Sequence, residues 1–271
     1  MGDKLGIIAG SGKIPFFLYQ EARKLGYQCV VAGIRGETDS GLQELAGEFQ
    51  WFDFDRLLDV VALFEQSEIR SVLLSGKIDP LRIYKKNDLN RSIFNLIEQS
   101  ADRSPTSLVL LAIDFFSKRG MTIEDPTRFL PSAFLDEGIL TAQPLPAAVE
   151  ADIQFGWEKA RNLADSDIGQ TLVVKDKAVV AVEGVDGTDE TIKRAGRLAG
   201  PGSVVIKLSR TRQDPRIDLP AVGLGTVLSL VDAQCAALCV EARRVAFFQK
   251  EESVETANAN GVALVVRERR I

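Results

Sequence analysis

The chain of 271 residues is long enough for two compact domains, and its 45% hydrophobic and 26% charged residues are typical of a globular protein. Its formal net charge of −5 argues against a general nucleic-acid binder, which would present a basic face. The absence of histidine excludes Ser–His–Asp hydrolases, histidine phosphotransferases and imidazole-ligated metal hydrolases, and leaves a hard ion such as Mg²⁺ as the expected metal.

Strands and helices alternate in the first half of the chain. The apolar run Leu5–Ala9 predicts a strand, and the amphipathic stretch Pro15–Leu25 predicts a helix that Gly26 ends. Such alternation is typical of a doubly wound parallel sheet, so we predict a Rossmann-like α/β domain over residues 1–128. The other predicted strands cover 28–32, 49–54 and 70–74, and the other predicted helices cover 56–66, 90–100 and 107–119.

Residues 129–148 are predicted to link two domains, because prolines punctuate this region and its periodicity is weak. From 149 to 271 the pattern predicts a second α/β domain. Paired strands occur beside helices there, which favours a mixed sheet over a second Rossmann unit. The predicted strands are 171–174, 178–183, 204–208, 237–240, 245–248 and 262–266, and the predicted helices are 150–164, 188–198, 226–232 and 252–260.

The sequence shows no feature of a secreted or membrane-spanning protein. The residues before the first strand lack the layout of a signal peptide. The longest apolar stretch, Leu108–Phe116, contains Asp114 and is far shorter than the ~20 residues of a spanning helix. Cys29, Cys235 and Cys239 follow no metal or disulfide pattern, so we expect buried free thiols. Together these observations predict a cytoplasmic protein.

Gly10-Ser11-Gly12 joins the first predicted strand to the first predicted helix. Glycines in such a turn let the backbone approach a phosphate, and the helix start supplies free N–H groups. The turn is not a Walker A loop, because Ile14 stands where Ser or Thr should follow the lysine. A tight strand–helix turn that binds nothing is the alternative.

The same turn lacks the marks of an NAD-binding fingerprint. Pro15 occupies the place of the third glycine. Gly33 and Arg35 stand where an acidic residue should close the second strand. A Rossmann-type oxidoreductase is therefore the least favoured of the functions that this fold allows.

Residues 207–220 form the stretch richest in charge. Its cations are Lys207, Arg210, Arg212 and Arg216, and its other polar groups include Gln213, Asp214 and Asp218. Such a loop suits two phosphates clamped by cations, with a carboxylate that holds Mg²⁺ or orients water. Pro220 restricts the residue before it to an extended backbone, which favours a fixed, partly desolvated Asp218. The alternative is a solvated loop whose charges pair with one another.

Two turns upstream form a candidate supporting shell. Gln170 directly precedes a predicted strand, and the turn from Glu183 to Asp189 leads from a strand into a helix. Gly187, Thr188 and Asp189 would offer N–H groups and a hydroxyl to a phosphate or sugar. Helix capping by Thr188 or Asp189 would explain the same residues without a ligand.

Several motifs in one order resemble the LpxI-type UDP-2,3-diacylglucosamine pyrophosphatase family. The resemblance covers nearly the whole chain and is densest between Ser166 and Val227. Spaced motifs in a fixed order are far more specific than any one of them. The motifs are AGSGKIP at the first turn, SGKI at Ser75–Ile78, EGILTAQPLP in the predicted linker, SDIGQTLVV, AVEGVDGTDETIKR and QDPRIDLPAVGLGTV.

The resemblance implies that residues 1–128 bind uridine diphosphate and that residues 149–271 form the catalytic and lipid-sugar domain. It implies Mg²⁺-dependent attack of water on the pyrophosphate of UDP-2,3-diacylglucosamine, which yields UMP and 2,3-diacylglucosamine 1-phosphate (lipid X) for lipid A synthesis. The catalytic aspartate of the family falls on Asp218, for which we predict a catalytic and metal-binding role. The predicted substrate-binding residues are Gly10, Ser11, Gly12, Lys77, Gln170, Gly187, Thr188, Asp189, Lys207, Gln213, Asp214 and Arg216.

A lipid-linked UDP-sugar as substrate implies at most peripheral contact with the inner membrane, and it leaves a homodimer open. The chain departs from the family near Arg103, where Pro105 and Thr106 replace two acids that are common there. This departure keeps an alternative open, namely a nucleotide-sugar or lipid-binding protein without turnover.

Overall fold

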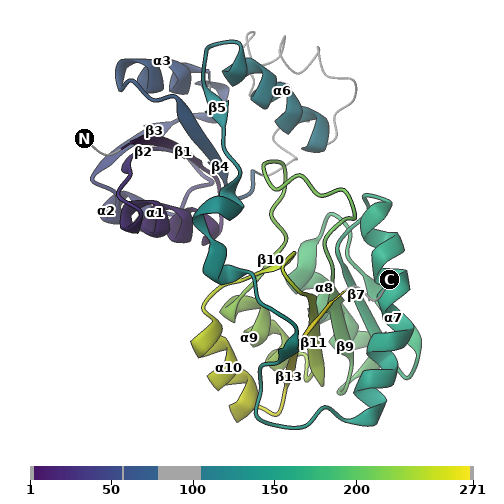
Figure 1. Ribbon diagram of the computed structural model, residues 1–271. Coiled ribbons are helices and arrows are strands. Elements are labelled where there is room, and N and C mark those ends of the chain that lie inside the picture. Colours follow the sequence, from purple (N-terminus) through teal and green to yellow (C-terminus); the bar gives the residue numbers. More distant parts are fainter. Residues whose placement is uncertain (1–2, 57, 79–104, 269–271) are drawn as a thin grey trace. The chain divides into compact units, whose positions relative to one another are not determined.

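The computed structural model describes residues 3–56, 58–78 and 105–268 (Figure 1). The chain divides into two compact units. The first contains Met1–Pro131 and Asp214–Asp218, and the second contains Ser132–Gln213 and Leu219–Ile271. The helix predicted over 90–100 lies outside the described residues, and the domain boundaries drawn from the sequence stay predictions.

A parallel sheet with the strand order β3-β2-β1-β4-β5 forms the centre of the first unit. Every neighbouring pair of strands is parallel, which confirms the predicted doubly wound sheet. The strands are β1 (Lys4–Ala9), β2 (Gln28–Ile34), β3 (Glu48–Phe52), β4 (Ser71–Ser75) and β5 (Thr122–Ile123). The helices are α1 (Ile14–Lys24), α2 (Gly41–Leu45), α3 (Asp59–Gln66) and α6 (Pro105–Ser117), with short 3₁₀ turns at Phe54–Arg56 and Pro126–Phe129.

Helices lie on both faces of this sheet (Figure 1). On one face, α1 buries Leu18 and Ala22. On the other face, Phe64 of α3 and Phe116 of α6 pack in a cluster that includes Ile8 of β1. In a doubly wound sheet with helices on both faces, ligands bind at the carboxyl ends of the strands.

A mixed sheet with the order β6-β13-β11-β9-β7-β8 forms the centre of the second unit. α7 (Ala147–Asp165) covers one face, while α8 (Gly187–Ala199), α9 (Leu224–Asp232) and α10 (Lys250–Ala259) cover the other. β9, β11 and β13 are parallel, whereas β7 runs antiparallel to both of its neighbours. The strands are β6 (Gly138–Ile139), β7 (Thr171–Lys175), β8 (Ala178–Val182), β9 (Val204–Lys207), β11 (Ala237–Glu241) and β13 (Ala263–Arg267).

The second sheet is mixed, as predicted, but its short strand β6 was not found from the sequence, and one predicted strand lies outside this sheet. The strand predicted at 245–248 contributes only β12 (Ala246–Phe247), which pairs with β10 (Ala221–Val222) in a separate two-stranded sheet. The predicted linker contains β6, which runs antiparallel to β13. Strands of two residues are too short to leave a periodic signal in the sequence.

The three cysteines are buried and unpaired, as predicted. Burial raises the pKa of the Cys29 and Cys235 thiols to about 11, so both are protonated and unreactive at neutral pH. Within the described ranges, no helix has the length and apolar character needed to cross a membrane.

Candidate functional site

The end of β9 and the start of β7 meet at one edge of the mixed sheet. β7 is antiparallel to β9, and the register pairs Thr171 with Lys207. Gln170, directly before β7, accepts a hydrogen bond at its carbonyl oxygen from Leu208 N–H at 3.0 Å. The hydroxyl of Thr188 in α8 lies 3.4 Å from the Thr171 hydroxyl. The topology therefore gathers three of the predicted residues, Gln170, Thr188 and Lys207.

Lys207 and Glu183 form a buried charged cluster at this edge, with 6% and 8% of their surfaces exposed. Lys207 Nζ donates to Thr188 Oγ1 at 2.7 Å and lies 3.9 Å from Glu183 Oε2. Glu183 accepts from the Thr188 hydroxyl at 2.9 Å and from Gln170 N–H at 3.0 Å. The Thr188 hydroxyl thus accepts from the cation and donates to the carboxylate, which fixes the two charges relative to each other.

The pKa of Glu183 is held below its usual value. Burial raises this pKa, but the charge of Lys207 and the hydrogen bonds from Thr171, Thr188 and Gln170 N–H together lower it by more. Glu183 is therefore ionised at neutral pH and supplies the counter-charge of the Lys207 ammonium. A cation fixed in this way at the end of a strand is suited to neutralise a phosphate oxygen.

Thr188 does not cap its helix. α8 begins at Gly187, and its N-cap residue is Asp186. The capping alternative for Thr188 is therefore wrong, because its hydroxyl is bonded to Glu183 inside the cluster. Asp189 is exposed in the first helical turn, where an acidic side chain complements the helix dipole. The structure brings Thr188 into the cluster and leaves Asp189 outside it.

Asp214 and Arg216 pair with each other in the charged loop. Arg216 Nη2 donates to Asp214 Oδ2 at 2.7 Å, and Arg216 Nε donates to Asp214 Oδ1 at 3.0 Å. The Arg216 hydrogen bonds hold the pKa of Asp214 below its usual range. For Asp214 and Arg216, the alternative prediction that charges of the loop pair with one another is therefore correct. Gln213 Oε1 accepts from Arg210 N–H at 3.3 Å.

Asp218 is half-buried at the end of the same loop. Its N–H donates to Asp214 O at 3.3 Å, and Ile217 N–H donates to the same carbonyl at 3.0 Å. Further along, Pro220 O accepts from Ala246 N–H at 2.8 Å, so backbone hydrogen bonds hold the chain before and after Asp218. A partly desolvated carboxylate on a held backbone is suited to orient water or to bind a cation.

The described part of the chain contains no group of three or more His, Cys, Asp or Glu side chains placed to hold a metal ion. Mg²⁺ at phosphate sites needs only one or two protein carboxylates, because water and phosphate oxygens complete its coordination. Asp218 fits the role of a single carboxylate ligand. Asp214 fits it less well, since both of its oxygens accept hydrogen bonds from Arg216.

The glycine turn of the first unit packs against the end of β4. Gly10 N–H donates to Ser75 O at 2.7 Å, and Ser11 exchanges backbone hydrogen bonds with Lys77 at 2.7 and 3.1 Å. A Cβ at Gly10 would lie 2.3 Å from Lys77 O, so glycine is required by this close approach. The N–H groups of Gly10 and Ser11 are therefore already bonded, and a phosphate would meet Gly12 and the start of α1 instead.

The surroundings of this turn include a buried hydroxyl and two lysines. Ser75 Oγ is buried and has no hydrogen-bond partner among the described residues. Lys77 is exposed. Lys13 Nζ donates to Asp39 Oδ2 at 2.6 Å, and this hydrogen bond holds the pKa of Asp39 below its usual range. The end of the parallel sheet therefore combines an unsatisfied hydroxyl with a helix start.

The segment that departs from the family pattern is only partly described. Arg103 and Ser104 lie outside the described residues, whereas α6 begins at Pro105. Proline is favourable at the first position of a helix, because its missing N–H would have no acceptor there. The departure thus coincides with a helix start.

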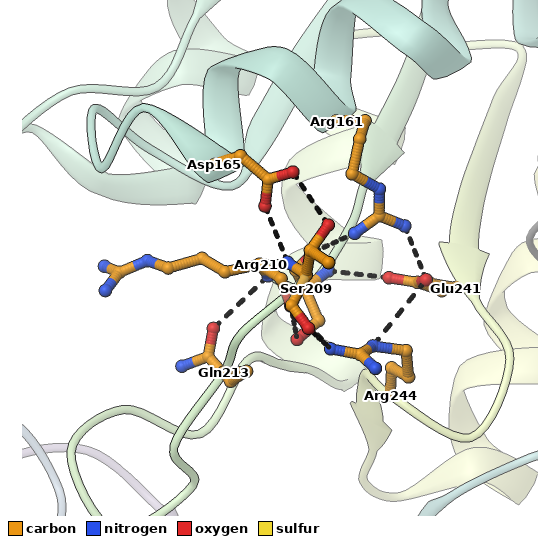
Figure 2. A network of polar contacts seen from close by, with 8 residues as sticks. Arg161, Asp165, Ser209, Arg210, Gln213, Glu241 and Arg244 are labelled. Atoms are coloured by element: carbon orange, nitrogen blue, oxygen red, sulfur yellow. Dashed lines mark hydrogen bonds and ion pairs between the residues drawn. The ribbon is translucent and has the colours of Figure 1, made fainter.

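Figure 2 shows a buried network that the sequence analysis missed, centred on Arg161 of α7 and Glu241 of β11. Glu241 ends β11, and Glu183 directly follows β8. Both are acids at the carboxyl end of an apolar strand, which is where sheets of this kind place functional side chains. That position is the signal that could have identified both residues. Thr171, the small first residue of β7, carries no comparable signal.

Two family models match the chain in sequence order. The model of the LpxI N-terminal domain matches residues 4–133, and the model of the LpxI C-terminal domain matches residues 136–265. A curated relative, the UDP-2,3-diacylglucosamine pyrophosphatase LpxI of Caulobacter vibrioides, is 26% identical over 271 residues, which cover 96% of this chain and 95% of the relative.

Solved structures show only weak likeness. Precorrin-6A reductase CobK is 10% identical, with 99% of this chain and 89% of that chain covered and a TM-score of 0.34. The biotin carboxylase domain of a thermophilic 2-oxoglutarate carboxylase is 14% identical, with 64% of this chain and 35% of that chain covered and a TM-score of 0.25. Scores this low carry no information about function.

Proposed function

Because the chain belongs to the LpxI family, we propose that it hydrolyses the pyrophosphate bond of UDP-2,3-diacylglucosamine and releases UMP and 2,3-diacylglucosamine 1-phosphate. The observation that carries this proposal is the match of both family models, in order, over residues 4–133 and 136–265. The alignment with the Caulobacter relative spans 96% of this chain and 95% of the relative, so the likeness extends over both of the residue ranges that the family models match.

The reaction needs charge neutralisation more than covalent chemistry from the protein. Water forms a bond to one phosphorus, the bond from that phosphorus to the bridging oxygen breaks, and the departing phosphate keeps the electron pair. The transition state is strongly negative, so fixed cations stabilise it most. Lys207 supports the proposal because Thr188 and Glu183 hold its ammonium in place, and little reorganisation is needed during the reaction.

Asp218 is the residue to which we assign the orientation of the attacking water or the binding of Mg²⁺. Its half-buried position and the hydrogen bonds of its backbone support this role. When bound, Mg²⁺ would neutralise phosphate charge and acidify a water molecule. Hydrogen bonds of Gln213, Asp214 and Arg216 shape the loop around Asp218, and the Arg216 guanidinium would add positive charge beside an approaching phosphate.

The uridine diphosphate moiety is assigned to the end of the parallel sheet, at Gly12 and the start of α1. The helix start favours an anion, and the Ser75 hydroxyl, which has no partner in the described part of the chain, supports a polar ligand at the adjoining end of β4. Gly10 and Ser11 would act by holding the turn against Lys77 rather than by donating their N–H groups.

We place the enzyme in the cytoplasm, at most in peripheral contact with the inner membrane through its acylated substrate. The net charge of −5 disfavours nucleic acid as a partner and disfavours strong electrostatic attraction to an anionic membrane surface.

The direct test is incubation of the purified protein with UDP-2,3-diacylglucosamine in Mg²⁺ and in EDTA, with UMP release as the readout. We expect release in Mg²⁺, loss of release in EDTA, and recovery when Mg²⁺ is restored. Undiminished release in EDTA would remove the metal from the proposal. Retention of the intact acylated UDP-sugar without UMP under either condition would establish the non-catalytic binding alternative instead.

A further inference from the structure

The strand-to-loop connection before Asp218 is held by side chains rather than by neighbouring strands (Figure 2). After β9 the backbone of Ser209, Arg210 and Thr211 leaves the sheet, and every one of these residues is bonded at its N–H and at its carbonyl by a side chain. Such bonding is a more specific constraint than a turn, because each side chain must come from its own place in the fold.

Arg161 and Glu241 form the inner layer of this anchor, with 5% and 1% of their surfaces exposed. Glu241 Oε2 accepts from Ser209 N–H at 3.0 Å, and Arg161 Nη1 donates to Ser209 O. Arg161 Nη2 also donates to Glu241 Oε1 at 2.5 Å. The two side chains of this ion pair therefore bond both the backbone N–H and the backbone carbonyl of Ser209, at the point where the chain leaves β9.

Arg244 and Asp165 form the outer layer. Arg244 Nη2 donates to Arg210 O at 2.5 Å and to Thr211 O at 3.2 Å, and its Nε lies 3.7 Å from Glu241 Oε1. Asp165, at the end of α7, accepts from Thr211 N–H at 2.6 Å and from the Thr211 hydroxyl at 2.7 Å. The inner layer thus bonds Ser209 and the outer layer bonds Arg210 and Thr211, and together they connect these three residues to α7, to the end of β11 and to Arg244 just beyond it.

The far stem of the loop is fixed independently. Pro220 O accepts from Ala246 N–H at 2.8 Å, and β10 pairs with β12 directly afterwards. The segment that carries Asp218 therefore spans two fixed stems of the second unit.

A buried ion pair is weak evidence for stability, because apolar side chains of similar volume often stabilise a protein as well or better. The geometry points to Arg161 and Glu241 as positioning residues, assisted by Arg244, that hold the loop of Asp218 in the arrangement needed for pyrophosphate hydrolysis. This inference rests on the proposed function and deepens it. Neither residue needs to touch the substrate.

The test compares Glu241→Gln with wild type in UMP release from UDP-2,3-diacylglucosamine and in amide hydrogen exchange between Asp214 and Asp218. Gln places an amide NH₂ or a neutral oxygen opposite Ser209 N–H and leaves Arg161 without its counter-charge. We expect kcat to fall by ~10²-fold with KM changed by less than ~3-fold, since misplacement of a reacting group by ~1 Å has such an effect. Exchange of the loop amides should be at least ~10-fold faster.

Two further variants keep the test decisive. Glu150→Gln, the matched control, removes a charge from the other end of α7, where Glu150 bonds Arg267 at 2.7 Å, and should leave kcat and loop exchange unchanged. Arg244→Ala removes the arginine of the outer layer, leaves Asp165 bonded to Thr211, and changes a side chain that is 39% exposed, so it should fold even where Glu241→Gln does not. It should again lower kcat and accelerate exchange.

The inference is supported if Arg244→Ala shows both faster loop exchange and lower kcat while Glu150→Gln shows neither change. Normal kcat and normal exchange in Arg244→Ala and Glu241→Gln would overturn it, as would losses of the same size in Glu150→Gln. Failure of the proposed function is recognised separately, because wild type would then release no UMP. The exchange measurement would still decide whether the anchor orders the loop.

Discussion

Replacement of Lys207 by Met removes the ammonium but keeps most of the side-chain volume. It leaves the Glu183 carboxylate, which is 8% exposed, without its counter-charge. Loss of one partner of a buried ion pair costs ~3–5 kcal/mol. Because the Thr188 hydroxyl and Gln170 N–H still bond Glu183, we expect the free energy of unfolding to fall by about 3 kcal/mol at neutral pH.

This loss should depend on pH through Glu183. In the wild type the pKa of Glu183 is lowered, so its ionised form stabilises the fold above the unfolded-state pKa, and this contribution is lost as pH falls through the folded-state pKa. In Lys207→Met, burial without the cation raises the pKa of Glu183. The deficit should therefore be largest at neutral and alkaline pH and should shrink as acid protonates the carboxylate.

The double variant Lys207→Met/Glu183→Gln separates stability from catalysis. It leaves no unpaired buried charge, so most of the lost stability should return. The cation that neutralises the phosphate is still missing, so kcat should stay ~10²-fold or more below wild type. Glu183→Gln alone is the matched control, because it keeps the ammonium.

Urea unfolding provides the stability readout. The chain has two tryptophans, and in a Trp51→Phe background Trp157 of α7 reports on the second unit. UMP release provides the activity readout. If the double variant regains both stability and activity, Lys207 serves only to balance Glu183, and its assigned catalytic role is wrong. Unchanged stability of Lys207→Met at pH 8 would contradict the buried ion pair itself.

Four further substitutions test three separate parts of the structure. Gly10→Ala places a Cβ 2.3 Å from Lys77 O and should destabilise the first unit by ~1–3 kcal/mol. Gly12→Ala has open space around the new Cβ but a φ of +92°, so it should cost about 1 kcal/mol. Equal urea midpoints for the two variants would refute the close approach at Gly10. Thr188→Val removes the hydroxyl between Lys207 and Glu183 and should cost ~1–3 kcal/mol, with wild-type stability as the contrary result. Asp214→Asn weakens a half-exposed ion pair and should change stability by less than ~1 kcal/mol, so a larger loss would show that the pair is structurally essential.

The elements and the sheet types of this protein could be predicted from its sequence because they depend on local pattern. The strand at β1 and the helix at α1 follow directly from an apolar run and an amphipathic stretch. The mixed character of the second sheet followed from strands that are adjacent in sequence. The two-residue strands β6 and β10 were missed because their pairing depends on partners elsewhere in the chain, whereas β12 lies within the strand predicted at 245–248.

The candidate site was only partly predictable, because long-range packing decides how polar groups are used. The sequence identified Lys207 and Thr188, but not that the Thr188 hydroxyl lies between the Lys207 ammonium and the Glu183 carboxylate. It identified a glycine turn, but the N–H of Ser11 is bonded to Lys77, which is 66 residues away in sequence. Arg161 and Glu241 are 80 residues apart, and no local pattern connects them.

The rate of UMP release by Asp218→Ala, measured beside wild type at saturating UDP-2,3-diacylglucosamine and Mg²⁺, tests the central claim most directly. We predict a kcat at least ~10³-fold lower, with unchanged circular dichroism and retained substrate binding, because a group that orients water or binds the metal is lost. A kcat within ~3-fold of wild type would contradict the assignment of Asp218 as the catalytic residue.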